Sequence, residues 1–128
     1  LGFSAADIRT NNELIAELCL SRRSDCDVIL VPIISPFRDA RASARQRLAP
    51  GFHEIWISAP LNCVIHRDVK GLYARAMAGE IPNMIGMSAE APYEAPEAPE
   101  LVLNSAAATV DDCVKTLVSY VRESLGAP

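Results

Sequence analysis

Two short segments, one around Ser35 and one around Phe3, contain residues that could bind a ligand that carries a purine ring. Ile34-Ser35-Pro36 closes an apolar run at residues 28–34. Ligands of open α/β sheets bind outside the carboxyl ends of strands, so Ser35 is a candidate site residue. The simpler interpretation is a turn serine ahead of a proline. Phe3 precedes a predicted helix and could stack on a purine face, or it could pack on the helix start as a hydrophobic staple. These residues alone favour neither role for Phe3.

A third motif lies in the stretch from residue 67 to residue 103, which reads RDVKGLYARAMAGEIPNMIGMSAEAPYEAPEAPELVL. Lys70 could bring a positive charge to an anion, and Gly71 would let the backbone approach a ligand closely. For Lys70-Gly71-Leu72 alone, a plain helix start with an exposed lysine is the simpler interpretation. The 128 residues contain no Gly-x-x-x-x-Gly-Lys-Ser/Thr loop, the motif that cradles nucleotide phosphates.

The hydrophobic pattern predicts strands that alternate with helices, as in an α/β fold with a parallel sheet. Continuous apolar runs predict buried strands at residues 28–34 and 53–59 and a short third strand at 101–103. Helices are predicted after Ser4, at residues 39–48, 61–67 and 72–78, and after Thr109. Pro32 has no N–H to donate to a ladder, so the first strand is expected to be bulged or to lack a partner there.

Composition limits the class of protein and its partners. A chain of 128 residues forms one domain at most. A net charge of −4 argues against a nucleic-acid surface, and no apolar stretch approaches the roughly 18 residues of a membrane span. Six arginines, at positions 22, 23, 38, 41, 45 and 47, are predicted to form a solvated helix face rather than a phosphate-binding patch.

The cysteines and histidines predict no metal site. Cys19, Cys26, Cys63 and Cys113 have no Cys-x-x-Cys spacing, so buried free thiols in a reducing compartment, the cytoplasm, are expected. His53 and His66 have no second metal ligand at a useful spacing.

Three motifs in the same order make the chain resemble the adenylylsulfate kinase (APS kinase) family. They are Leu1-Gly2-Phe3-Ser4, Ile34-Ser35-Pro36-Phe37-Arg38 and the stretch at 67–103. The resemblance runs from Leu1 to about Val121. It implies a P-loop kinase-like parallel sheet sandwiched by helices, present here only in part, because the first strands and the phosphate loop are missing. Residues 1–128 would be a single partial domain, with the Pro-rich residues 79–100 as its lid-like loop.

The resemblance also implies roles for individual residues. Phe3 would stack on the adenine of adenylylsulfate, Met84 would take the place of a second, aromatic, residue in the lid, and Asn11 would hold the substrate. Further substrate contacts would come from Ile34, Ser35, Pro36, Lys70, Gly71 and Leu72. Ser35 is also the expected active-site residue, and Arg67 would lie near the ATP base.

The implied reaction moves the γ-phosphoryl group of ATP to the ribose 3′-hydroxyl of adenylylsulfate. The product, 3′-phosphoadenylylsulfate, serves sulfate assimilation, and the cofactors would be ATP and Mg²⁺. In the family, the strand that leads into the phosphate loop lies between those matching 28–34 and 53–59. Without that strand, the chain alone is expected to be poorly soluble or to form a homodimer.

Three departures from the family pattern leave three interpretations open. Ile8 replaces a substrate-holding arginine, Glu13 lies in a normally basic stretch, and Met84 replaces the lid aromatic. Arg9 is about 100° around the helix from position 8, so it is not an automatic replacement. In the first interpretation, the chain is part of an active APS kinase, alone or fused to an ATP sulfurylase domain. In the second, it is a degenerate, non-catalytic domain with a nucleotide-binding or regulatory role. In the third, it is a related P-loop nucleotide kinase with altered specificity.

Overall fold

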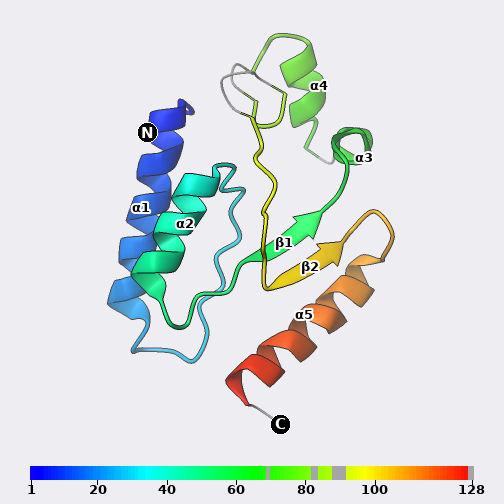
Figure 1. The fold of residues 1–128 in the computed structure, drawn as a ribbon. Coiled ribbons are helices and arrows are strands. Elements are labelled where there is room, and N and C mark those ends of the chain that lie inside the picture. Colours follow the sequence, from blue (N-terminus) through cyan, green and yellow to red (C-terminus); the bar gives the residue numbers. More distant parts are fainter. Residues whose placement is uncertain (69, 82–83, 88–91, 127–128) are drawn as a thin grey trace. The chain divides into compact units, whose positions relative to one another are not determined.

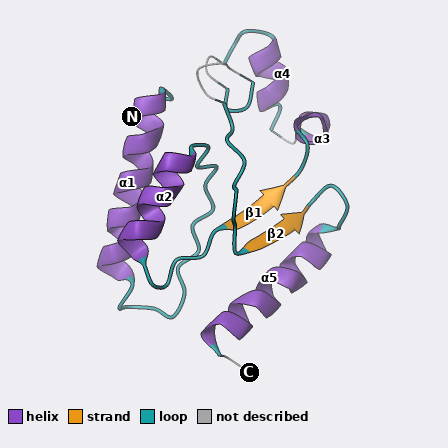
Figure 2. Ribbon diagram, viewed as in Figure 1, coloured by secondary structure: helices purple, strands orange, loops and turns teal. Residues whose placement is uncertain are grey.

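The structure, a computed structural model, describes residues 1–68, 70–81, 84–87 and 92–126. The helices and strands, in chain order, are α1 (Ala5–Arg22), α2 (Arg38–Leu48), β1 (Ile55–Ser58), α3 (Leu61–Arg67), α4 (Leu72–Met77), β2 (Leu101–Asn104) and α5 (Val110–Leu125) (Figure 1). The two strands are parallel, with Ile55 opposite Leu101 and Ser58 opposite Asn104 (Figure 2). The predicted α/β class is confirmed, and the helices differ from their predicted bounds by about one residue.

Contacts divide the chain into two compact units. Unit 1 comprises Leu1–Phe52 and Arg75–Ala95, and unit 2 comprises His53–Ala74 and Pro96–Pro128. In unit 1, α1 packs on α2 (Figure 1). In unit 2, α5 packs on β2. None of the helices in the described part of the chain combines the length and apolarity that a membrane span requires.

Side-chain caps begin the two longest helices where the sequence predicted them. The Ser4 hydroxyl accepts from the Asp7 amide at 3.1 Å and donates to the Asp7 carboxylate at 2.9 Å. Thr109 Oγ1 accepts from the Asp112 amide at 3.1 Å. Each cap satisfies an amide that has no partner within its helix. Gly126 closes α5 in the left-handed conformation that favours glycine, with φ of 66°.

The buried face of α1 is made of small and polar side chains rather than of leucines. Asn12, Ala16 and Cys19, spaced by four and three residues, are the buried residues of the helix. Leu14 and Leu18 are 52% and 59% exposed. The small Ala16 lets α2 approach closely, whereas the leucine side of α1 is left open to solvent. The exposed leucines of α1 therefore do not mark its buried face.

Residues 28–34 do not form the predicted strand. The ladder between β1 and β2 is the only one among the described residues. The Ile33 amide donates instead to the Val31 carbonyl at 3.1 Å, across Pro32, which has no amide hydrogen. A strand needs a neighbour for its N–H and C=O groups, and this segment has none in the described structure. Its side chains stay accessible, and Leu30 is 72% exposed.

All four cysteines are free thiols. Cys19 is buried, and Cys63 and Cys113 are half-buried. Cys26 is exposed, so the prediction of buried thiols is wrong at that position. The reason is its place in the connection that follows α1, outside any packed element.

We expect the isolated chain to self-associate through the apolar run at 28–34, because contact between copies would remove these side chains from water. Sedimentation velocity over a concentration series should show dimers or larger species. Leu30→Lys should shift the distribution toward monomer, since it places a charge within the run. Leu14→Lys, at an exposed leucine on α1, is the matched control. A chain that stays monomeric throughout, or that responds equally to both substitutions, would contradict this assignment.

Candidate functional site

Ser35 lies in a strained turn at residues 34–37, called here the Ser35 turn, which leads into α2. Its φ of 43° is in the left-handed region, which costs a residue other than glycine about 1–3 kcal/mol. Asn12 Nδ2 donates to Ser35 Oγ at 3.2 Å, and Arg41 Nη1 donates to the Ser35 carbonyl at 2.8 Å. Pro36, the next residue, is fully buried. Groups from two helices thus hold a conformation that the serine alone would not favour.

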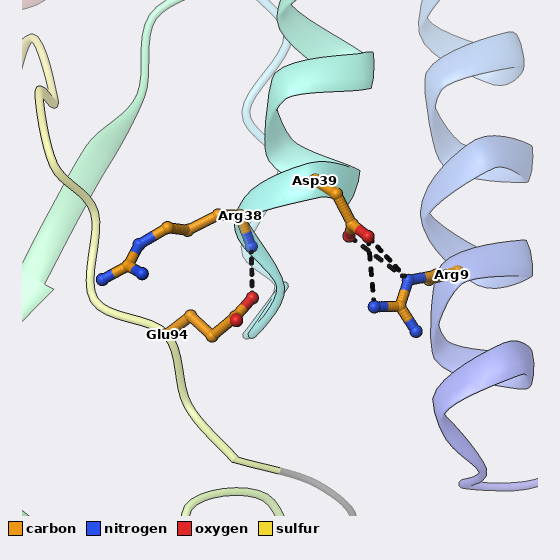
Figure 3. Close-up of polar contacts among 4 residues, drawn as sticks. All are labelled: Arg9, Arg38, Asp39 and Glu94. Atoms are coloured by element: carbon orange, nitrogen blue, oxygen red, sulfur yellow. Dashed lines mark hydrogen bonds and ion pairs between the residues drawn. The ribbon is translucent and has the colours of Figure 1, made fainter.

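The N-terminus of α2 is capped by a residue that is distant in the sequence. Phe37 occupies the N-cap position, and its side chain makes no capping hydrogen bond. Glu94 Oε1 instead accepts from the Arg38 amide at 2.9 Å (Figure 3). The Glu94 amide donates to the Pro36 carbonyl at 2.8 Å, and Arg38 Nε donates to the Ala95 carbonyl at 2.9 Å. The segment at 94–95 is therefore tied to both the Ser35 turn and the first residue of α2.

Arg9 is committed to contacts within unit 1. Its Nε lies 3.2 Å from each carboxylate oxygen of Asp39, and its Nη2 lies 3.1 Å from Oδ2 (Figure 3). Its guanidinium carbon lies 4.2 Å from the centre of the Phe37 ring, close enough for a cation–π contact. The hydrogen bond from Arg9 is the main reason that the pKa of Asp39 lies below its usual 3.8. These contacts hold the Arg9 guanidinium group against Asp39 and Phe37.

Unit 1 holds six of the predicted site residues: Phe3, Asn11, Ile34, Ser35, Pro36 and Met84. Phe3 is 75% exposed, as a stacking surface requires, and more exposed than a staple packed on α1 would be. Asn11 is exposed on α1, and Ile34 is 60% exposed. Met84 is half-buried, and its carbonyl accepts from the Met87 amide.

Lys70-Gly71-Leu72 lies on a fixed turn in unit 2. The Asp68 carboxylate accepts from the amides of Tyr73 and Ala74, both at 3.0 Å, and so caps α4. The Gly71 amide donates to the Asp68 carbonyl at 2.9 Å. Gly71 has φ of 68°, which favours glycine even though an added Cβ would meet no atom. Lys70 is exposed, so its charge is accessible from solvent.

Arg67, the residue expected near an ATP base, has a structural contact in unit 2. Its Nη2 donates to the Ser105 carbonyl at 2.7 Å, so it links the end of α3 to the turn that follows β2. The side chain remains exposed. No group of three His, Cys, Asp or Glu side chains within the described ranges could hold a metal ion.

The clustered arginines do more than solvate a helix face. Arg23 donates to the Leu48 carbonyl at 3.2 Å, and Arg45 lies 5.0 Å from the Phe52 ring centre. Arg47 pairs with Glu17 at 3.5 Å. Together with the contacts of Arg38 and Arg41, these interactions show that the arginines also bind groups on neighbouring segments. The reason is that arginine side chains can reach carbonyls and rings on neighbouring segments.

Sequence reasoning missed three residues that shape the site: Asn12, Arg41 and Glu94. A signal for Asn12 was present, because it lies at helical spacing from Ala16 and Cys19 and is the polar member of that stripe. Arg41 and Glu94 carried no local signal that separated them from the surrounding charged residues.

Asn12→Ala should lower the free energy of unfolding by about 1–2 kcal/mol, because a buried amide and its hydrogen bond to Ser35 are lost. Asn11→Ala is the matched control, since Asn11 is exposed on the same helix, and it should change stability by less than about 0.5 kcal/mol. Urea unfolding of both variants measures the difference. Equal effects of the two substitutions would contradict the buried role of Asn12.

The pair of Arg9 and Asp39 should stabilise the fold only while Asp39 is ionised. Because folding lowers the pKa of Asp39, this contribution is complete above 3.8 and is lost as the pH falls through the lowered value. The difference in melting temperature between the wild type and Asp39→Asn should therefore shrink at acidic pH. In an Arg9→Gln background the same substitution should give little difference at any pH. An unchanged pH dependence without Arg9 would contradict the pairing.

Comparison with known proteins identifies a matching family model and several similar proteins. The family model described as adenylylsulphate kinase matches residues 1–104. An adenylyl-sulfate kinase of Bacillus velezensis is 40% identical over 126 residues, which are 98% of this chain and 63% of that protein. The bifunctional enzyme NodQ of a Rhizobium species is 38% identical over 124 residues, 96% of this chain and 19% of that protein.

A solved structure adds evidence for the fold. The Mycobacterium tuberculosis APS kinase CysC, in complex with AMPPNP and APS, matches with a TM-score of 0.81 and 35% identity. The match covers 96% of this chain and 70% of that chain. The chain spans 61–63% of the length of several curated relatives. On the family match and these identities, this chain belongs to the adenylylsulphate kinase family.

Proposed function

We propose that the chain forms the adenylylsulfate-binding part of an APS kinase, the enzyme that transfers the γ-phosphoryl group of ATP to the 3′-hydroxyl of adenylylsulfate. The observation that carries the proposal is the strained Ser35 turn, which Asn12 and Arg41 hold in place. Strain that neighbouring groups maintain is concentrated at functional sites. Phosphoryl transfer depends mainly on positioning and on charge stabilisation, so a fixed substrate wall is a direct contribution to catalysis.

Ser35 is suited to donate a hydrogen bond to the substrate. A serine hydroxyl offers one donor and two acceptor sites. Its oxygen already accepts from Asn12, so the hydroxyl hydrogen can be directed toward an oxygen of adenylylsulfate. Ile34 and Pro36 flank this group, with Ile34 open to solvent and Pro36 supporting the turn from inside.

The adenine and the anionic end of the substrate need different partners. Exposed Phe3 offers a stacking surface, and base stacking on an aromatic ring contributes about 1–3 kcal/mol. Asn11 can donate and accept hydrogen bonds, and Met84 can make a soft contact with the ring. Lys70, beside Gly71 and Leu72 in unit 2, carries an exposed positive charge of the kind that binds a phosphate or sulfate group.

ATP would supply the phosphoryl group, with Arg67 near its base, and Mg²⁺ would neutralise phosphate charge. We assign no Mg²⁺ ligands, since the described residues offer no set of three candidate side chains. The free thiols support a reducing compartment such as the cytoplasm. The bifunctional relative supports a fusion to a second enzyme domain, for which an ATP sulfurylase is the candidate.

Calorimetric titration tests this function. Adenylylsulfate should bind the chain, and Phe3→Ala should weaken binding about tenfold by removing the stacking surface. Leu18→Ala, which shortens another exposed apolar side chain in unit 1, is the matched control and should leave the affinity unchanged. A folded chain that does not bind adenylylsulfate would contradict the proposal. Equal affinity for other nucleoside monophosphates would favour a nucleotide kinase of altered specificity instead.

A further inference from the structure

Glu94 completes the N-terminus of a helix that lies 56 residues before it in the sequence. The first amides of any α-helix lack partners within the helix, and an acidic group there is favoured by the helix dipole. Phe37 cannot provide an acceptor from its side chain, and Glu94 Oε1 takes the Arg38 amide at 2.9 Å (Figure 3). The start of α2 thus depends on a residue outside the helix.

Arg41 joins the same two segments from inside α2. Its Nη1 donates to the Ser35 carbonyl at 2.8 Å, and its Nη2 donates to the Glu94 carbonyl at 2.6 Å. Both bonds are partly buried. Because the guanidinium group is planar and rigid, one side chain fixes the spacing between these two carbonyls.

A third connection is made by the backbone. The Glu94 amide donates to the Pro36 carbonyl at 2.8 Å. The carbonyls of Ser35 and Pro36 belong to the two peptide planes on either side of Pro36, and both are now held. We call this set of contacts, among Ser35, Pro36, Arg38, Arg41 and Glu94, the Glu94 clasp.

We propose that Glu94 and Arg41 are positioning residues, which hold Ser35 in its left-handed conformation and so direct its hydroxyl toward adenylylsulfate. This inference rests on the proposed function for the identity of the ligand. The clasp and the ligand then stabilise the same conformation of the Ser35 turn. Formation of the clasp therefore raises the affinity for the ligand by the same factor as the bound ligand raises the equilibrium constant for forming the clasp. Neither residue needs to touch the substrate.

Hydrogen–deuterium exchange of the free chain tests the clasp without any ligand. In Glu94→Ala, the peptide that covers the first turn of α2 should exchange about tenfold faster, because the Arg38 amide loses its acceptor. Glu94→Gln should be intermediate, since its amide oxygen can still accept. Glu17→Ala removes a different carboxylate from unit 1, one that is exposed, and should leave this peptide unchanged. Unchanged exchange in Glu94→Ala would overturn the clasp.

Affinity tests the effect on the ligand. Glu94→Ala and Arg41→Lys should each weaken adenylylsulfate binding about tenfold, the size expected for a lost charge-assisted hydrogen bond. Adenosine binding, which would use Phe3 rather than Ser35, should change little, and Glu94→Gln should restore most of the affinity. Equal loss for both ligands, or loss for neither, would overturn the positioning role. A wild-type chain that fails to bind adenylylsulfate would count against the proposed function, while the exchange experiment judges the clasp separately.

Discussion

The site depends on the backbone conformation of Ser35, which serine does not favour and which must be maintained by neighbouring groups. The maintaining groups come from three places in the chain. Asn12 on α1 holds the hydroxyl, Arg41 on α2 holds the carbonyl, and Glu94 in the loop before β2 holds the next peptide. The packing of α1 on α2 positions the first two groups, and the hydrogen bond between the Glu94 carboxylate and the Arg38 amide keeps the third in place. The proposed substrate wall therefore depends on the packing of unit 1 as a whole rather than on one loop.

The elements that could be predicted from the sequence are those specified by nearby residues. Ser4 and Thr109 cap helices through groups three residues away, so a local pattern predicts both starts. The apolar run at 28–34 shows the limit of such reasoning. Its composition is that of a buried strand, but a strand also needs a neighbour, and none is available among the described residues. Pro32 was the evidence in the sequence against a regular strand here, because proline has no amide hydrogen to contribute to a ladder.

The candidate site was predictable in part for the same reason. Ser35 could be found because it follows the apolar run, and Phe3 because it precedes a helix start. Asn12 and Glu94 could not be given their roles, because their partners lie 23 and 56 residues away and no periodicity links them. Family resemblance helped with the residues that would face a ligand. It gave no information on the residues behind them, which only the packed structure identifies.

The most direct test of the account is to map the binding surface for adenylylsulfate on the chain by NMR. Amide chemical shifts should change on addition of the ligand at Phe3, at Ser35 and at the first turn of α2, where the Glu94 clasp transmits the contact. The amides of α5 should change little, since no ligand contact is proposed there. Shift changes confined to α5, with none at the Ser35 turn, would contradict the claim that this turn is a wall of the substrate site.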